Sequence, residues 1–160
     1  VLQNRPSPRA KIVDFFPTGS DERQYCSPGF DLPVGSIMRT MYGCFPEYHT
    51  SADNRDFISF EALQESVDVY LDVCLALENN RRYRSLCPFG EPQLGKRGLY
   101  ASPAAGEDAA TAVEPMLWLF NLADGSHDLL QIAQRSGVAV SRLHDAAQRA
   151  LDAGLLVIND

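Results

Sequence analysis

The sequence predicts an α/β unit in its first hundred residues, followed by a smaller, mostly helical unit. Short apolar runs rich in β-formers alternate with turn formers before residue 47, and a long apolar stripe at helical spacing comes next. Three shorter helical patterns then follow an alanine-rich stretch that also contains Ser, Pro and Gly. We therefore expect one domain over residues 1–100, a linker over 101–112 and a second domain over 113–160.

Two strands are expected in the α/β unit. Lys11–Phe16 is a short apolar run that ends at Pro17, and Ser36–Tyr42 alternates apolar and polar side chains. A polar loop follows each of them, at residues 19–25 and 46–54. Because ligands of α/β sheets bind at the carboxyl ends of the strands, the two loops would share one rim if the strands are parallel neighbours.

The chemistry-bearing side chains of these two loops are the candidate site. They are Asp21, Glu22 and Arg23 in the first loop, and Tyr48, His49 and Asp53 in the second. His49 is the only histidine before residue 127, and it lies among Pro and Gly residues instead of on an apolar helix face. The alternative is an ordinary solvated loop histidine, and the pattern alone leaves both interpretations open.

A long helix is expected from about Phe60 to Glu78. Ser59 is a suitable N-cap, and Glu61 in the first turn favours the helix dipole. The apolar stripe consists of Leu63, Val67, Tyr70, Leu71, Cys74 and Leu77. At this spacing the residues share one face, which predicts that the face is buried and that Cys74 serves as a small buried apolar residue.

The rest of the chain predicts a small helical unit after an irregular stretch at 79–98. Three helices are expected, at Pro115–Leu122, at Asp128–Ser136 with Ser126 as cap and Gly137 as stop, and at Arg142–Ala153 with Ser141 as cap. A short strand, Leu155–Ile158, follows them. Three helices with a tight turn between the second and third, followed by a strand, are the outline of a winged helix.

The net charge indicates which classes of binding partner to expect, and the cysteines indicate the redox compartment. The net charge of −7 argues against nucleic acid or an anionic membrane as the main partner, and from Val113 onward three arginines stand against six acids. We therefore expect the winged helix to contact a protein partner or a second copy of the chain. None of the four cysteines forms a C-x-x-C pair; a Cys26–Cys44 disulfide stays open, but reduced thiols and a cytoplasmic location are favoured.

No apolar run approaches the roughly 20 residues that span a bilayer, and no secretion signal opens the chain. The chain begins without Met, as Val-Leu-Gln-Asn, which we interpret as the inside of a longer protein.

Two stretches carry a family resemblance. Gly-Ser-Asp-Glu-Arg-Gln-Tyr at 19–25 and Pro-Glu-Tyr-His-Thr-Ser-Ala-Asp-Asn at 46–54 resemble the aminopeptidase-like zinc hydrolases, relatives of the bacterial aminopeptidases and of glutamate carboxypeptidase. Residues 93–100 and 122–130 are similar to a bacterial branch in which an aminopeptidase-like domain precedes a winged helix. The resemblance implies the C-terminal part of a three-layer α/β domain followed by a winged-helix domain.

The resemblance also implies roles for the candidate residues. His49 corresponds to a zinc ligand, and Tyr48 to a tyrosine that hydrogen-bonds the oxyanion of a tetrahedral intermediate. Asp53 would orient the loop or His49. Glu22 stands where the family has a histidine and is a catalytic candidate, while Asp21 and Arg23 would face the substrate. The family's other zinc ligands and its catalytic acid have no counterpart here, because no H-x-D or glutamate pair precedes residue 19.

Three functions follow as hypotheses. The first is the C-terminal portion of a zinc-dependent peptidase or amide hydrolase, incomplete on its own, with a peptide or small amide as substrate. The alternative is a non-catalytic aminopeptidase-like module that docks a protein through its winged helix, with a link to polysaccharide biosynthesis that some members of the branch carry in their names. The third, a DNA-binding regulator, is disfavoured by the charge balance.

Overall fold

The computed structural model describes residues 1–2, 10–17, 19, 21–100 and 109–159. The chain divides into two compact units, one formed by residues 7–66 and the other by residues 1–6 with 67–160. The described residues combine helices with one small antiparallel sheet, which agrees with the prediction of a fold that mixes helices and strands. Among the described residues, no helix has both the length and the apolar character needed to cross a bilayer.

The C-terminal unit is built around a three-stranded antiparallel sheet. Its strands are β1 (Arg82–Ser85), β2 (Asp124–Asp128) and β3 (Leu156–Ile158), in the order β2-β1-β3. The middle strand, β1, lies in the stretch 79–98 that the sequence analysis treated as irregular. A unit cut at residue 113 would therefore lack the strand that both of its other strands pair with.

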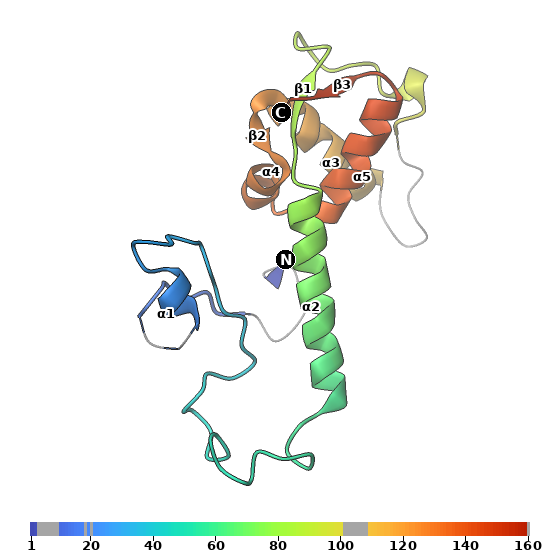
Figure 1. The fold of residues 1–160 in the computed structure, drawn as a ribbon. Coiled ribbons are helices and arrows are strands. Elements are labelled where there is room, and N and C mark those ends of the chain that lie inside the picture. The colour runs from blue at the N-terminus through green and yellow to red at the C-terminus, as the bar shows by residue number, and fades with distance from the viewer. Residues whose placement is uncertain (3–9, 18, 20, 101–108, 160) are drawn as a thin grey trace. The chain divides into compact units, whose positions relative to one another are not determined.

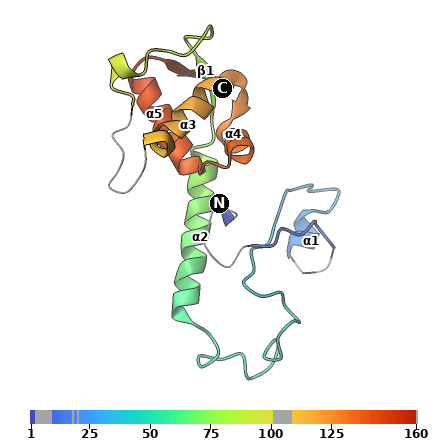
Figure 2. The same cartoon turned by 180° about the vertical axis from the view of Figure 1, so that it is seen from behind.

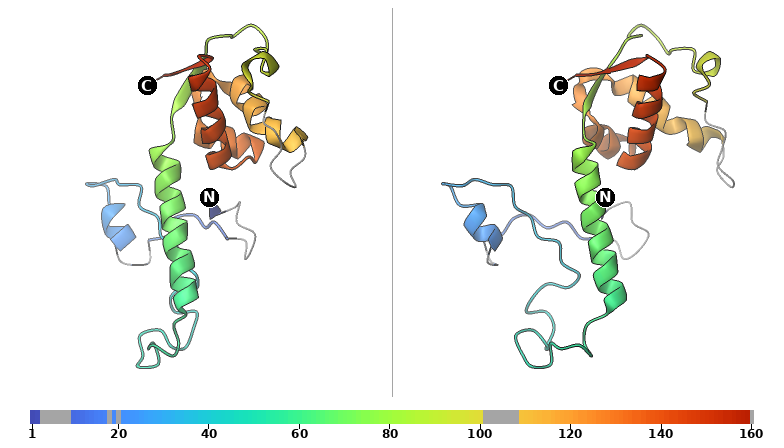
Figure 3. Two further views of the ribbon diagram at one scale, coloured as in Figure 1. Left: turned by 90° about the vertical axis from the view of Figure 1, so that its right-hand side faces the viewer. Right: turned by 45° about the vertical axis from the view of Figure 1, so that its right-hand side comes forward.

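Three helices complete this unit: α3 (Ala109–Leu122), α4 (Leu129–Ser136) and α5 (Val140–Asp152). Each helix contacts the other two, and each also contacts a strand of the sheet (Figures 1 and 2). One hydrophobic core lies between them, and it includes Leu119, Leu129 and Leu143, which are fully buried. The three helices and the strand after them confirm the winged-helix outline, which can be followed from two further directions in Figure 3.

The helix boundaries correct three local predictions. Helix α3 begins at Ala109, so Pro115 lies inside the helix instead of in its first turn. Residues 109–112 of the expected linker are thus helical, and residues 101–108 lie outside the described residues. Helix α5 begins at Val140 and has no side-chain cap, so Ser141 is a helical residue and not the N-cap. A cap requires a side chain one residue before the first turn, and Ala139 occupies that position.

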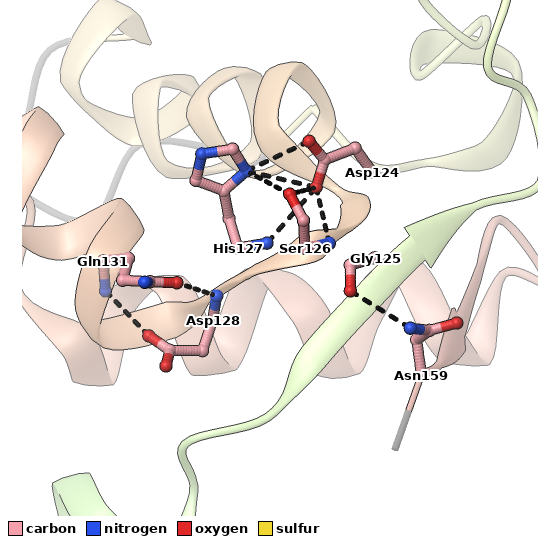
Figure 4. A network of polar contacts seen from close by, with 7 residues as sticks. All are labelled: Asp124, Gly125, Ser126, His127, Asp128, Gln131 and Asn159. Carbon is pink, nitrogen blue, oxygen red and sulfur yellow. Dashed lines mark hydrogen bonds and ion pairs between the residues drawn. The ribbon is translucent and has the colours of Figure 1, made fainter.

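The junction between β2 and α4 is a dense polar network (Figure 4). Asp128, not Ser126, is the N-cap of α4, and it forms a reciprocal capping box with Gln131. Ser126 instead donates its backbone N–H and its hydroxyl to the Asp124 carboxylate, at 2.7 and 2.8 Å. The Nδ1 atom of His127 lies 3.1 Å from both Asp124 oxygens. The Ser126 and His127 donors hold the pKa of Asp124 well below its usual value.

In residues 7–66 the two expected strands are absent from the described part of the chain. Lys11–Phe16 and Ser36–Tyr42 form no strand, and no backbone hydrogen bond pairs either of them with another segment. Apolar alternation is a local signal, whereas a strand also needs a neighbour to complete its ladder, and none of the described residues supplies one. Among the described residues from 10 to 59, the regular element is the short helix α1 (Asp21–Tyr25).

The long helix α2 has the predicted bounds, Phe60–Glu78. Ser59 caps it as expected, because its hydroxyl accepts the backbone N–H of Ala62 at 3.2 Å. The prediction that the apolar face of this helix is buried is wrong, because Leu71 is 56% exposed and Cys74 is exposed as well. The helix buries only Val69 and Ala76, seven residues apart and thus on one line along it, while its opposite side carries apolar side chains that are half exposed or more. All four cysteines are free thiols.

Candidate functional site

The candidate site in residues 7–66 centres on the turn from Glu47 to Thr50. The backbone N–H of Thr50 donates to the carbonyl of Glu47 at 3.1 Å, so Tyr48 and His49 are the two central residues of a four-residue turn. His49 has a φ of 58°, which places it in the left-handed region that favours glycine. A histidine held there is an outlier of the kind that concentrates at functional sites.

Aromatic rings hold the side chain of Tyr48 on several sides. The Tyr48 ring stacks on the His49 imidazole, with centroids 4.1 Å apart and planes inclined by 16°. The Tyr42 ring is tilted against the Tyr48 ring, with centroids 6.1 Å apart, and the Phe45 ring meets the Tyr48 ring edge-on, with centroids 5.7 Å apart. Phe57 stacks on Phe45 in turn, at 5.7 Å. Such pairs stabilise by about 1 kcal/mol each beyond the area they bury, so the five rings form one cluster around Tyr48.

Tyr42 also connects this cluster to the first loop. Gly19 has a φ of 78°, and a Cβ atom there would lie 2.9 Å from the Tyr42 hydroxyl and would collide with the Glu22 carboxylate. The hydroxyl and the carboxylate therefore both lie beside the α carbon of Gly19. Glu22 therefore lies close to Tyr42, which in turn contacts Tyr48, although the strands that were expected to place it are absent from the described residues.

Tyr42 is the residue that the sequence analysis missed. It was assigned to the end of an expected strand, and an aromatic residue before Gly43 carries no signal of its own. Only the ring contacts and the close approach to Gly19 reveal its place between the two loops.

The other predicted site residues are not drawn into this cluster. Asp21 and Arg23 lie on α1 with exposed side chains. Asp53 is exposed, and its carboxylate has no hydrogen-bond or ion-pair partner among the described residues, so it does not orient His49 by direct contact. Its backbone N–H does donate to the carbonyl of Thr50 at 3.2 Å, which makes Asp53 part of the loop's fold.

A zinc site needs three or four protein ligands, and His49 is one candidate among the described residues. No group of three or more His, Cys, Asp or Glu side chains capable of holding a metal ion occurs in the described part of the chain. His49 is exposed, and a neutral imidazole is a suitable zinc ligand, but one imidazole does not make a site. The other ligands of any zinc at His49 would have to come from outside the described residues.

Comparison with protein families divides the chain near the end of α2. Residues 1–80 match a family described as a domain of unknown function, DUF4910. The chain belongs to this family. Residues 81–158 match a family described as winged helix-turn-helix, and this range includes β1. The match agrees with the sheet, whose middle strand begins at Arg82.

Two relatives extend the comparison to whole proteins. A protein of Clostridium acetobutylicum, provisionally named a polysaccharide biosynthesis protein with an aminopeptidase-like domain, is 49% identical over 136 residues, which is 85% of this chain and 31% of that protein. A crystal structure of a provisionally named peptidase from the same organism matches 91% of this chain and 31% of its own, with 45% identity and a TM-score of 0.79. The chain therefore spans about a third of these relatives, and its similarity supports a peptidase-like region followed by a winged helix.

Proposed function

We propose that this chain is the portion of a zinc-dependent peptidase or amide hydrolase that carries the Tyr48–His49 pair, with a peptide or a small amide as substrate. The observation that carries the proposal is the pair itself: an exposed imidazole on a left-handed backbone, stacked on a tyrosine at 4.1 Å. The aminopeptidase-like and peptidase names of the two relatives support the reaction class.

In this proposal the side chains have distinct tasks. His49 supplies one imidazole ligand, and its neighbour Tyr48 offers a phenol that can donate a hydrogen bond to a developing oxyanion. Glu22, beside Gly19 and Tyr42, offers a carboxylate for proton transfer. Asp21 and Arg23 extend the exposed polar rim on α1, where they would contact substrate. Bound zinc supplies Lewis acidity and lowers the pKa of a water molecule.

Metal analysis of the full-length polypeptide tests the assignment. Wild type and His49→Ala are purified without added chelator, and the zinc content of each is measured by atomic emission. We expect a marked loss of zinc in His49→Ala. His127→Ala is the matched control, because His127 pairs with Asp124 in the winged-helix unit and should leave the zinc content unchanged. Equal zinc in wild type and His49→Ala would remove His49 from the metal site.

A second function is favoured by one observation: residues 81–158 match a winged helix, and both arginines of its helix α5 donate to backbone carbonyls of this chain. A non-catalytic aminopeptidase-like module would use this winged helix to dock a protein partner or a second copy of the chain. One relative's name links it to polysaccharide biosynthesis. Absence of zinc from the full-length wild type, together with a stable complex of defined stoichiometry in size-exclusion chromatography with light scattering, would favour this alternative.

A further inference from the structure

The turn that presents Tyr48 and His49 is held from one side by a single hydroxyl. The Oγ1 atom of Thr50 donates to the carbonyl of Glu47 at 2.8 Å, the same carbonyl that accepts the Thr50 backbone N–H. That hydroxyl also accepts the backbone N–H of Ala52 at 3.2 Å. Thr50 therefore ties the first residue of the turn to the backbone that follows it.

The next residues repeat this arrangement. The side-chain amide of Asn54 donates to the carbonyl of Ser51 at 3.1 Å, and its oxygen accepts the backbone N–H of Asp56 at 2.9 Å. Thr50 and Asn54 thus fold consecutive turns by side-chain to backbone bonds, a use for which Thr and Asn are well suited. Asp53, between them, makes no such bond with its carboxylate.

The left-handed backbone at His49 needs this support. A non-glycine residue in that region costs about 1 kcal/mol or more, and such a conformation persists only where its surroundings over-determine it. The His49 side chain makes a ring contact with Tyr48 but no hydrogen bond among the described residues. The bonds of Thr50 to Glu47 and Ala52 are consequently the polar restraints closest to His49 along the chain.

We propose that Thr50 is a positioning residue for the Tyr48–His49 pair: its hydroxyl closes the Glu47–Thr50 turn so that the imidazole is held stacked on the Tyr48 ring. The part of this proposal that concerns zinc rests on the proposed function above. The part that concerns the ring geometry does not, because it involves only the two side chains and the turn that carries them.

The test uses the full-length polypeptide with Thr50→Val and Thr50→Ser. Valine keeps the shape of threonine but removes the hydroxyl, and serine keeps the hydroxyl but removes the methyl group. Ser51→Ala is the matched control, since the Ser51 hydroxyl makes no hydrogen bond among the described residues. Histidine-selective NMR of the metal-free protein follows the His49 ring protons, assigned by their loss in His49→Ala. A proton above the face of a neighbouring aromatic ring resonates upfield of its usual position.

We expect the upfield shift of His49 to be present in wild type, Thr50→Ser and Ser51→Ala, and to be largely lost in Thr50→Val. An unchanged His49 signal in Thr50→Val, or a loss of equal size in Ser51→Ala, would overturn the proposal. Circular dichroism of the variants during heating checks folding, because His127 lies in the winged-helix unit and does not report on residues 7–66. A wild-type transition in Thr50→Val, together with rescue of the His49 shift in Thr50→Ser, identifies a local effect.

Zinc affinity, measured by chelator competition on the same variants, separates this proposal from the function on which it rests. Residues that orient a metal ligand typically contribute 10- to 100-fold to affinity, so we expect Thr50→Val to bind zinc about 10-fold more weakly, with rescue in Thr50→Ser. If Thr50→Val loses the ring shift while His49→Ala binds zinc as wild type does, the positioning role stands and the zinc assignment of His49 fails. If zinc affinity depends on His49 but neither the ring shift nor the affinity changes in Thr50→Val, Thr50 has no positioning role.

Discussion

Residues 81–158 form a hydrophobic core to which α2 adds only Ala76, whereas residues 10–66 and the rest of α2 leave most of their apolar side chains exposed. In the first region Leu119, Leu129 and Leu143 are fully buried. In the second, no described residue before Val69 is buried, and Phe16 is 70% exposed. The boundary between the two regions coincides with the boundary between the two matching families.

The difference shows that apolar side chains specify a packed fold only where another element of the chain offers a surface for them to pack against. The winged-helix region carries both its helices and its sheet, so each apolar face meets another. Helix α2 has the bounds its sequence predicts but no cover for its apolar face. Since the relatives are about three times as long as the matched region, we expect their additional length to cover the corresponding face.

The largest effect should come from removing β1. A fragment of residues 113–160 lacks the middle strand of its sheet, whereas residues 81–160 retain it. We expect the longer fragment to unfold cooperatively on heating and the shorter one to show no such transition, because β2 and β3 pair only with β1. Circular dichroism during thermal denaturation measures this. A cooperative transition in residues 113–160 would show that β1 is dispensable.

The next largest difference is expected between matched Leu→Ala variants of the two regions, measured as the loss in free energy of unfolding. Leu119→Ala removes a fully buried side chain from the winged-helix core and should lower the free energy of unfolding by about 2–5 kcal/mol. Leu71→Ala removes a side chain that is 56% exposed on α2 and should cost less than about 0.5 kcal/mol in this chain. Urea denaturation of both variants provides the values.

The Leu119→Ala and Leu71→Ala variants can also be compared in a polypeptide of the relatives' full length. There the cost of Leu71→Ala should rise toward the range of a core truncation if the additional length covers α2. A cost for Leu71→Ala that stays below about 0.5 kcal/mol in both contexts would argue against such a cover.

The sequence correctly predicted those features that residues close together in the chain determine. The bounds of α2 follow from the Ser59 cap and the helical period, and the stop of α4 follows from Gly137 at a φ of 77°. The prediction failed where a distant partner decides. β1 is a short Arg-Tyr-Arg-Ser strand with little apolar signal, and it exists because β2 and β3 flank it. Lys11–Phe16 carries the stronger strand signal but has no flanking strand among the described residues.

The candidate site shows the same division. Tyr48 and His49 are sequence neighbours in a turn, so their contact could be expected from the motif. Glu22 comes near the ring cluster only through Tyr42, which is distant from it in sequence and lies in neither of the two family-like stretches. The family resemblance gives Asp53 the role of orienting the loop or His49, which stays a prediction, whereas the bonds that close the turn come from Thr50.

A smaller effect is expected from acid on the β2–α4 junction. The pKa of Asp124 is lowered by the Ser126 and His127 donors, so its contribution to stability is complete above the ordinary pKa of about 3.9 and is lost as the pH falls below that value. Because the carboxylate is about half exposed, we expect Asp124→Ala to cost only about 1 kcal/mol at pH 7.

Urea denaturation between pH 7 and pH 2.5 checks this. The wild-type and Asp124→Ala curves should converge at the acid end, and Asp124→Asn, which keeps an acceptor oxygen without the charge, should lie between them. A constant difference across the whole range would mean that the ionised carboxylate is not responsible.

The smallest effect, none at all, is expected for duplex DNA added to the winged-helix region. Wing-and-helix readers gain affinity from Lys and Arg side chains that neutralise phosphates. On α5 the two arginines are already engaged: Arg142 donates to the carbonyl of Thr111 at 2.7 Å, and Arg149 donates to that of Leu99 at 2.9 Å. Asp145 and Asp152 lie on the same helix and would repel a phosphate backbone.

Including β1 changes the charge balance of the region but not the expectation. Residues 81–160 carry eight Lys and Arg against nine Asp and Glu, a net charge of −1 that is still unfavourable for a DNA reader. Mobility-shift titration of this fragment at low salt, where electrostatic binding is strongest, is the most permissive measurement. Binding at micromolar concentration or below that weakens steeply with salt would show that the arginines leave their carbonyl partners for phosphates. An absence of binding at low salt would leave the exposed side of α5 for contact with protein.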